Sequence, residues 1–208
     1  MKIALDFHDF SVLNNRLDLL TKLKEHFPKL KVSMFTVPFD SRFEGNVEGR
    51  TMRDKTLAMI KENLDWIQII PHGLTHMERE FENCDRETMI MSLAAIDEVF
   101  KKDGLPYEKG FCAPQWLWNQ DVVDVLNDRG WWGAVDRNQP NMLCPKKLYK
   151  YTHSIDQPFW TAREIDVMRL HGHIDGVSQN DLERCFLNLM KMPSDAEFVF
   201  VTDVLEEL

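Results

Sequence analysis

The sequence predicts a single α/β domain, residues 1–208, in which seven short strands alternate with helices. The 208 residues are a usual length for one domain. Apolar residues make up 44% and charged residues 28% of the chain, which excludes the disordered and fibrous classes of protein. Apolar runs of strand length alternate with segments whose apolar residues recur at helical spacing. This alternation implies parallel strands joined by right-handed crossovers, and both an open sheet and a barrel satisfy it.

The first part of the chain is predicted to contain three strands and two helices. Residues 2–7 are a short apolar run typical of a strand, and residues 14–27 carry leucines at helical spacing before a proline. Residues 31–37 are expected to form the second strand. Residues 51–64 place their apolar side chains on one helical face, and residues 66–70 follow as the third strand.

Two helices in the middle of the chain have recognisable ends. Residues 85–102 show the strongest helical periodicity, and Asp85 is a suitable N-cap. A second helix is expected over 121–129, where Asn119 can cap the beginning. Gly130 stands where a glycine commonly ends a helix.

The remaining elements continue the alternation. Four further strands are predicted from short apolar runs, at 110–113, 131–135, 165–170 and 197–202. Ser178, with an acidic residue three positions later, is expected to open a helix that extends to residue 192. Residues 137–162 contain prolines and no periodicity, so we expect an irregular insertion or lid there.

Composition excludes several partners and compartments. With 34 acidic and 25 basic residues the net charge is −9, which argues against a nucleic-acid partner. No apolar run of membrane-spanning length occurs, and the N-terminal residues lack the apolar region of a signal peptide. We therefore expect a cytoplasmic protein without a membrane partner. The four scattered cysteines match neither a metal knuckle nor a disulfide framework and are interpreted as reduced core thiols. The oligomeric state stays open.

Polar residues gather after the predicted strands. Because parallel strands end at one rim, residues that follow them are expected to lie close together. Five of the seven histidines occupy such positions, together with three aspartates, a cysteine, a proline and a tryptophan. These residues are Asp6, His8, Asp9, His72, His76, Cys112, Pro114, Trp116, Asp136, His171 and His173.

His72 and His76 have the i, i+4 spacing that places two imidazoles on one face of a helical turn. Together with one aspartate they could bind zinc, or iron, cobalt or manganese, and leave positions open for water and substrate. A bound dication would lower the pKa of water and polarise a carbonyl. A base and an acid would complete such a hydrolase site. The alternative interpretation is an ordinary pair of surface or core histidines.

Five segments resemble the motifs of the polysaccharide deacetylase family with NodB homology. Residues 5–10 (LDFHDF) resemble L-T-F-D-D-G, and residues 72–76 (HGLTH) resemble H-[ST]-x-x-H. Residues 112–114 (CAP) fall on R-x-P, while residues 132–136 and 170–173 (LHGH) fall on two later motifs. The order and spacing cover nearly the whole chain. The resemblance implies an irregular (β/α)7 barrel.

The resemblance also implies roles for individual residues. It makes Asp9, His72 and His76 the ligands of one divalent ion, with zinc first and cobalt, manganese, nickel or iron as alternatives. It makes His171 or His173 the general acid. It implies that the sugar pocket is shaped by Pro114, Trp116 and Trp132.

Two positions depart from the family pattern. His8 stands where the family has its base aspartate, and Cys112 stands where it has an arginine. A neutral imidazole can still accept a proton, so His8 or the nearby Asp6 is the expected base. His8 could also be a fourth metal ligand. Asp136 could take over the role of the arginine in orienting the base, and it is also expected among the residues that bind the substrate.

These residues predict a metal-dependent hydrolase that removes an N-acetyl or similar acyl group from an amino sugar by means of metal-bound water. The expected partner is a small carbohydrate or sugar conjugate. A relative that binds metal and carbohydrate without catalysis is the first alternative, because the aspartate base and the arginine are absent. Hydrolysis of another amide or of a phosphoester is the second alternative.

Overall fold

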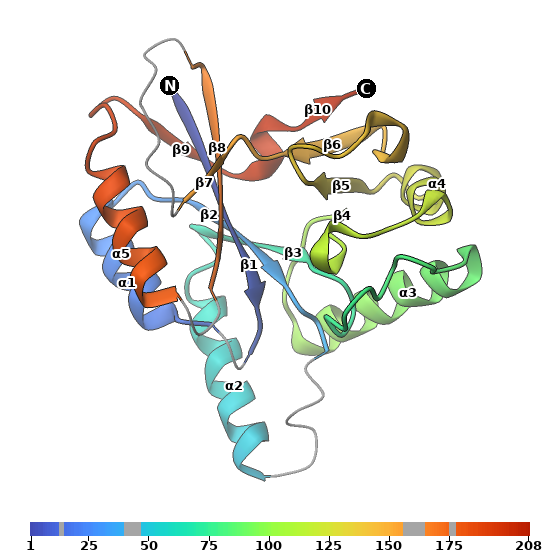
Figure 1. Ribbon diagram of the computed structural model, residues 1–208. Coiled ribbons are helices and arrows are strands. Elements are labelled where there is room, and N and C mark those ends of the chain that lie inside the picture. Colours follow the sequence, from blue (N-terminus) through green and yellow to red (C-terminus); the bar gives the residue numbers. More distant parts are fainter. Residues whose placement is uncertain (13–14, 40–46, 156–164, 175–177) are drawn as a thin grey trace.

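The computed structural model describes residues 1–12, 15–39, 47–155, 165–174 and 178–208. Within these ranges ten strands are flanked by five α-helices (Figure 1). The strands are β1 (Lys2–Phe10), β2 (Val32–Thr36), β3 (Ile67–Pro71), β4 (Gly110–Phe111), β5 (Trp132–Val135), β6 (Lys147–Lys150), β7 (His153–Ser154), β8 (Val167–His173), β9 (Glu197–Val199) and β10 (Glu206–Glu207). The helices are α1 (Leu17–His26), α2 (Val47–Lys61), α3 (Arg86–Asp103), α4 (Gln120–Asp128) and α5 (Ser178–Leu189).

The strands form two ladders that together make an irregular barrel. One ladder has the order β3-β2-β1-β8-β7, with β9 also paired to β1, and its described pairs are parallel. The other has the order β10-β6-β5-β4, in which only β10 is antiparallel. An isolated parallel bridge between His72 and Cys112 links the end of β3 to the end of β4. On the opposite side the chain itself passes from β6 to β7, so the barrel is not closed by a continuous ladder.

The seven predicted strands and the five predicted helices are all present, with ends shifted by a few residues. The prediction for 137–162 was wrong in part, because β6 and β7 lie inside that segment. Leu148 and Tyr149 are adjacent and both buried. Strand β6 therefore lacks the alternation of apolar and polar residues that marks a strand with one face exposed to solvent. Pairing with β5 fixes this strand, and tertiary context of that kind is invisible to local periodicity. Residues 156–162 lie outside the described residues.

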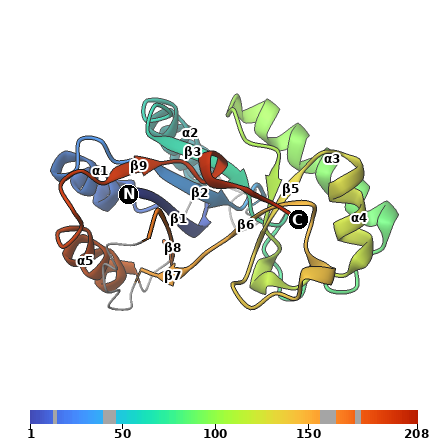
Figure 2. The same cartoon turned by 90° about the horizontal axis from the view of Figure 1, so that it is seen from above.

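The helices cover the outside of the barrel. Helices α1 and α5 lie side by side on one flank, and α3 and α4 lie side by side on the other (Figures 1 and 2). Leu17, Leu20 and Leu23 of α1 are buried in the layer between helices and strands. None of the helices in the described ranges has the length and apolar content needed to cross a bilayer.

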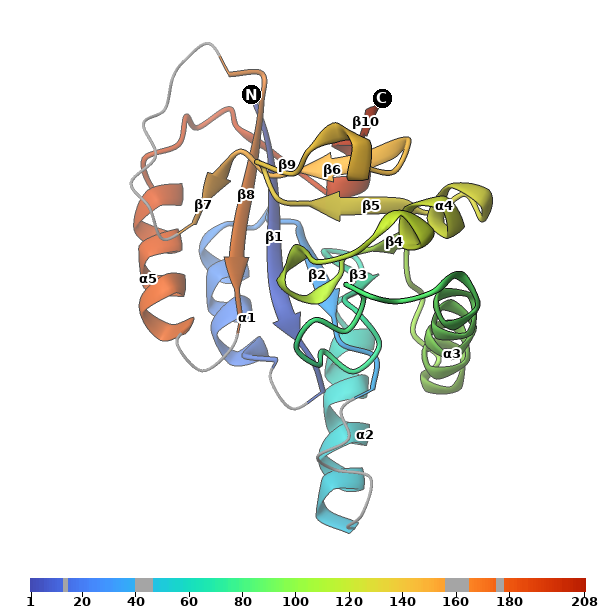
Figure 3. The ribbon, with the colours of Figure 1, turned by 45° about the vertical axis from the view of Figure 1, so that its right-hand side comes forward.

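Strand β1 runs through the centre of the molecule (Figure 3). Its side chains enter two different core clusters. Ile3, Leu5 and Phe7 belong to the larger apolar cluster, which includes the buried faces of the helices. Ala4 faces the opposite way, into a smaller cluster inside the barrel. Because side chains alternate along a strand, Asp6 and His8 continue the Ala4 side toward the end of β1. Two polar residues therefore lie inside the barrel toward the carboxyl ends of its strands.

The predicted helix ends are confirmed where the structure describes them. The side chain of Asp85 accepts a hydrogen bond from the Thr88 amide at 2.7 Å, and Asn119 accepts one from the Val122 amide at 3.2 Å. Gly130 follows the end of α4 with φ 67, as its position predicted. Helix α5 begins at Ser178, whose side chain lies outside the described residues. All four cysteines are buried and free.

Replacing Asn119 by alanine is expected to lower the free energy of unfolding by about 1–2 kcal/mol. The substitution removes the N-cap of α4 and also the hydrogen bond from the Asn119 amide to the Cys84 carbonyl. Urea denaturation of the two proteins measures the difference. Asn119→Ser keeps a capping oxygen and should recover part of the loss. Equal losses in both variants would contradict the capping role.

Candidate metal and catalytic site

The end of β1 is shaped so that Asp9 reaches the rim of the barrel. The register between β1 and β2 shifts between Phe7 and Phe10, which marks a bulge. Asp9 lies in this interval with φ 60, a left-handed conformation that non-glycine residues seldom adopt. Bulges and left-handed residues recur beside functional sites, where they redirect a side chain. The bulge thus supplies a carboxylate at the position where β3 also ends.

Asp9, His72 and His76 come together as the sequence predicted, and we call this group the first site. The Asp9 Oδ1 atom lies 3.1 Å from the Nε2 atom of His72 and 2.8 Å from that of His76. The His72 side chain is buried, whereas about a third of the His76 side chain is exposed (34%). One oxygen and two nitrogens that converge at a partly open rim match a three-ligand metal site.

The protonation of His72 and Asp9 also suits a metal ion, whereas the hydrogen bond to Asp9 raises the pKa of His76, so an ion has to displace a proton there. His72 Nδ1 lies 3.1 Å from the Cys112 carbonyl and donates to it, which leaves the Nε2 lone pair directed at the first site. Burial lowers the pKa of His72. Burial raises the pKa of Asp9, but the adjacent imidazoles of His72 and His76 outweigh it and hold this pKa far below its usual range. A neutral imidazole and an ionised carboxylate are the forms that bind metal.

The turn from His72 to His76 is not the helical turn that the spacing indicated. Gly73 has φ 62, and a Cβ there would lie 2.6 Å from the Glu80 carboxylate and 2.8 Å from the Pro114 ring. His76 itself has φ 59. Only glycine combines this backbone conformation with so close an approach. The two imidazoles therefore meet through a tight irregular turn, with ring centroids 4.7 Å apart.

Glu80 holds this turn in place. Its carboxylate accepts hydrogen bonds from the backbone amides of Leu74, Thr75 and His76 at 3.0–3.3 Å and from the Thr75 hydroxyl at 2.9 Å. Glu80 belongs to a mostly charged run at 78–82, in which Arg79 and Glu82 form an exposed ion pair. Glu80 instead points inward, and nothing in the local sequence pattern distinguishes it from its neighbours.

Replacing Glu80 by glutamine is expected to weaken metal affinity at the first site about 10- to 100-fold, because a neutral amide cannot accept all of these hydrogen bonds. Titration of the metal-free protein with Zn²⁺ in a calorimeter measures the change. Glu78→Gln is the matched control, since Glu78 is exposed on the same turn. Similar affinities for both variants would show that Glu80 does not position the ligands.

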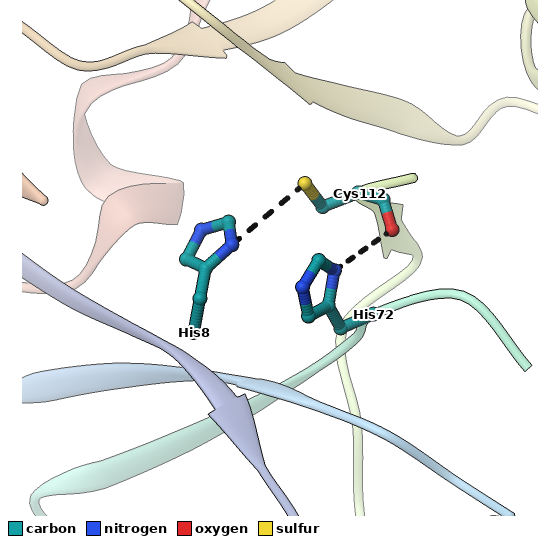
Figure 4. A group of neighbouring side chains, drawn as sticks. All are labelled: His8, His72 and Cys112. Carbon is teal, nitrogen blue, oxygen red and sulfur yellow. Dashed lines mark hydrogen bonds between the residues drawn. The ribbon is translucent and has the colours of Figure 1, made fainter. Parts of the chain in front are cut away.

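His8 lies next to the first site, inside the barrel. It is 2% exposed, and its ring centroid lies 4.7 Å from that of His72. Its Nδ1 atom is 4.0 Å from the Cys112 sulfur (Figure 4). Its Nε2 atom has no hydrogen-bond partner among the described residues and lies 3.4 Å from the Asp6 carboxylate. Burial, and then the neighbouring His171 and His72, lower the pKa of His8 and keep the imidazole neutral.

Asp6 is buried completely and is fully engaged. Its Oδ1 atom accepts from His171 Nδ1 at 2.7 Å, and its Oδ2 atom accepts from the Tyr149 hydroxyl at 2.8 Å. The expectation that Asp6 could act as an open base therefore does not fit its surroundings. His171 is buried, while His173 is exposed at the rim, with ring centroids 4.8 Å apart.

The predicted pocket residues divide into two groups. Trp116 is half-buried with φ 61, and its ring centroid lies 4.8 Å from His8 and 5.3 Å from His171. Pro114 is buried beneath the turn at Gly73. Trp132 does not line an open pocket, because its ring is 5% exposed and fills the barrel interior against Phe35.

Asp136 does not contact the site histidines directly, because Tyr151 lies between it and His171. Its Oδ2 atom accepts from the Tyr151 hydroxyl at 2.6 Å, and the Tyr151 ring centroid is 4.8 Å from that of His171. It therefore does not replace an arginine beside His8. Tyr149 and Tyr151, which contact the site, were missed because they lie in the segment expected to be irregular.

The fold and the site together define an α/β barrel with a histidine–carboxylate cluster at the carboxyl ends of its strands. No family model matches the sequence, and no curated protein sequence matches it. A family 4 acetyl xylan esterase from Clostridium thermocellum, in complex with a cobalt ion, has TM-score 0.59 and 16% identity over 98% of this chain and 89% of that chain. A peptidoglycan N-acetylglucosamine deacetylase has TM-score 0.64 and 12% identity over 97% and 86%.

A pseudoenzyme of the same carbohydrate esterase family 4 (CE4), from Bacillus anthracis, has TM-score 0.61 and 12% identity over 95% of this chain and 63% of that chain. A mutant of that pseudoenzyme with restored enzymatic activity is also similar, with TM-score 0.62. Identities this low show the fold. The chain has the fold of the CE4 polysaccharide deacetylases, and the irregular (β/α)7 barrel implied by the NodB resemblance is confirmed.

Proposed function

We propose that this protein is a metal-dependent hydrolase that removes an acetyl or similar acyl group from the nitrogen of an amino sugar. The observation that carries the proposal is the convergence of the first site, where the Asp9 carboxylate lies 3.1 and 2.8 Å from two imidazole nitrogens. Asp9, His72 and His76 would hold one divalent ion, with zinc as the first candidate. When bound, such an ion lowers the pKa of a coordinated water toward about 7 and polarises a carbonyl.

His8 and His171 are the proposed base and acid. His8 is a neutral imidazole beside the first site and can take the proton of the attacking water. His171 donates its Nδ1 proton to Asp6, so in the imidazolium form its second proton, on Nε2, is the one that can be transferred to the departing nitrogen. Asp6 is then a positioning residue that orients the His171 ring and stabilises its imidazolium form. His173, exposed beside it, is the alternative acid.

The aromatic surroundings support a carbohydrate as the substrate. The half-buried Trp116 ring lies over His8 and His171, where an apolar face can stack against a sugar ring. The Tyr151 ring extends this surface, with its centroid 5.7 Å from that of Trp116. A small carbohydrate or sugar conjugate would thus lie with its amide beside the first site.

The test is acetate release from N-acetylglucosamine oligomers by untagged protein that has been stripped of metal and reloaded with one equivalent of Zn²⁺ or Co²⁺ per chain. We expect release by the reloaded protein and none by the stripped protein or by His76→Ala. His26→Ala is the control, because His26 is exposed on α1, away from the site. Metal-independent release, or release that survives in His76→Ala, would overturn the proposed mechanism.

A second candidate, a non-catalytic metal- and carbohydrate-binding protein, is favoured by the surroundings of His8. This imidazole is almost completely buried, and its neighbour is a thiol whose pKa burial raises well above the usual value. The variant His8→Asp/Cys112→Arg places a carboxylate and a guanidinium at these positions. A gain of acetate release would indicate a degenerate site, whereas loss of existing release would indicate that His8 and Cys112 work as they stand.

A further inference from the structure

We propose that Asp6, His8 and His171 form a second metal-binding site, which takes a divalent ion of borderline softness such as Zn²⁺. This second site shares no residue with the first site. It lies deeper in the barrel. An ion bound there would occupy the lone pair of His8, so occupation of the second site would exclude the base role proposed for His8 above and would inhibit acetate release. Like the first site, it consists of one carboxylate and two imidazoles.

The donor atoms lie close to the separations that an ion requires. His8 Nε2 lies 3.4 Å and His171 Nδ1 lies 2.7 Å from the same Asp6 oxygen. All three ligand atoms lie within 4.8 Å of one another. Around a tetrahedral zinc ion with bonds of about 2.0–2.1 Å, donor atoms are roughly 3.3 Å apart. The contact between Asp6 and His171 has to open by about half an ångström, and the Nδ1 proton that His171 donates to Asp6 has to be released to solvent when the ion binds.

The second independent observation is the unpartnered nitrogen of His8. Nε2 is buried without a hydrogen-bond partner in the described part of the chain, and it is directed at Asp6. The other ring nitrogen, Nδ1, faces the Cys112 sulfur at 4.0 Å (Figure 4). A proton on Nδ1 can be donated toward this sulfur, which leaves the Nε2 lone pair free to bind an ion. Ligation would satisfy an atom that is otherwise costly to bury.

The charge of Asp6 gives the third argument. A fully buried carboxylate needs a compensating partner, and no lysine or arginine in the described ranges forms an ion pair with it. The Tyr149 hydroxyl holds Oδ2 and leaves Oδ1 directed at the two imidazoles. Hydrogen bonds of this kind orient the carboxylate ligands of metal sites. A dication between Asp6, His8 and His171 would supply the missing positive charge.

A different donor set around His8 is less suitable. His8, His72 and Cys112 also lie within 4.8 Å of one another. However, the Nε2 atom of His72 faces Asp9 in the first site, and its Nδ1 atom donates a hydrogen bond to the Cys112 carbonyl. Neither nitrogen of His72 is therefore available to a second ion. The Cys112 thiol would also have to lose its proton in a buried position. The contacts therefore favour the carboxylate set.

The experiment counts metal ions by plasma mass spectrometry in untagged protein equilibrated with Zn²⁺ and desalted. We expect about two ions per chain in the natural protein, about one in His76→Ala and in His8→Ala, and none in the double variant. His26→Ala should keep two. One ion in the natural protein that is lost in His76→Ala, or two ions in His8→Ala, would overturn the proposal.

Two further measurements remain decisive even if His8→Ala fails to fold. Calorimetric titration of the metal-free natural protein with Zn²⁺ should resolve two binding events, and Tyr149→Phe should weaken one of them about 10- to 100-fold. A single event would contradict the second site. Cys112→Ser should retain both ions, and loss of one would assign the ion to the thiol-containing set instead. Because these readouts count ions, they can fail or succeed independently of acetate release.

Discussion

Asp9→Asn is expected to empty the first site and to lower kcat/KM for acetate release by about 10³-fold or more, because an ion at such a site contributes several kcal/mol to catalysis. Asparagine has nearly the same shape as aspartate but carries no charge. It also puts a side-chain amide in place of the carboxylate whose Oδ1 atom both His72 and His76 contact. Steady-state kinetics with one equivalent of Zn²⁺ per chain gives the rate, and mass spectrometry after equilibration with excess Zn²⁺ gives the metal content.

Asp54→Asn is the matched control for this substitution, since Asp54 is exposed on α2. It should leave both rate and metal content unchanged. The natural protein and Asp9→Asn should differ by about one ion per chain, so an ion bound by Asp6, His8 and His171 would remain. Full activity in Asp9→Asn would exclude the first site as the centre of the reaction.

Gly110→Ala is expected to lower the free energy of unfolding by about 3 kcal/mol or more, at the upper end of what overpacking a core costs. A Cβ at Gly110 would lie 2.2 Å from two carbon atoms of the Trp132 ring. Trp132 cannot retreat easily, because it is enclosed by the core cluster that includes Phe35 and Tyr149. Equilibrium denaturation by urea gives the loss.

Two comparisons separate the clash from other effects of the added methyl group. Gly130→Ala meets no heavy atom within 4 Å and should cost only the strain of its left-handed backbone, about 1–2 kcal/mol. Gly110→Ala combined with Trp132→Leu should be more stable than Gly110→Ala alone, because the smaller side chain makes room for the methyl group. A double variant less stable than Gly110→Ala alone would contradict the proposed clash.

The strand positions could be predicted because most strands are short apolar runs bounded by clear helix signals. Asp85, Asn119 and Gly130 mark helix ends through contacts a few residues away, so local sequence carries this information. Strand β6 depends instead on pairing with β5, and its two adjacent buried residues do not alternate. Elements fixed by distant partners are the ones that periodicity misses.

The same distinction applies to the site. The convergence of Asp9, His72 and His76 followed from the rule that parallel strands end at one rim. The position of Glu80 did not, because its partners are backbone amides in a turn whose shape the sequence does not reveal. Trp132 faces the barrel interior, but only the structure shows that it is packed below the rim rather than open to a ligand.

The bridge between His72 and Cys112 has a consequence for motion at the rim. The two ladders meet there through few hydrogen bonds, which include Gly73 amide to Cys112 carbonyl at 2.8 Å and Cys112 amide to Pro71 carbonyl at 3.1 Å. Amides in so short a connection exchange their hydrogens through local opening. A metal ion bound to the His72 imidazole would restrain this connection between the two ladders. Deuterium uptake at Gly73 and Cys112 should therefore slow when Zn²⁺ is added, while the amides of α4 keep their rates.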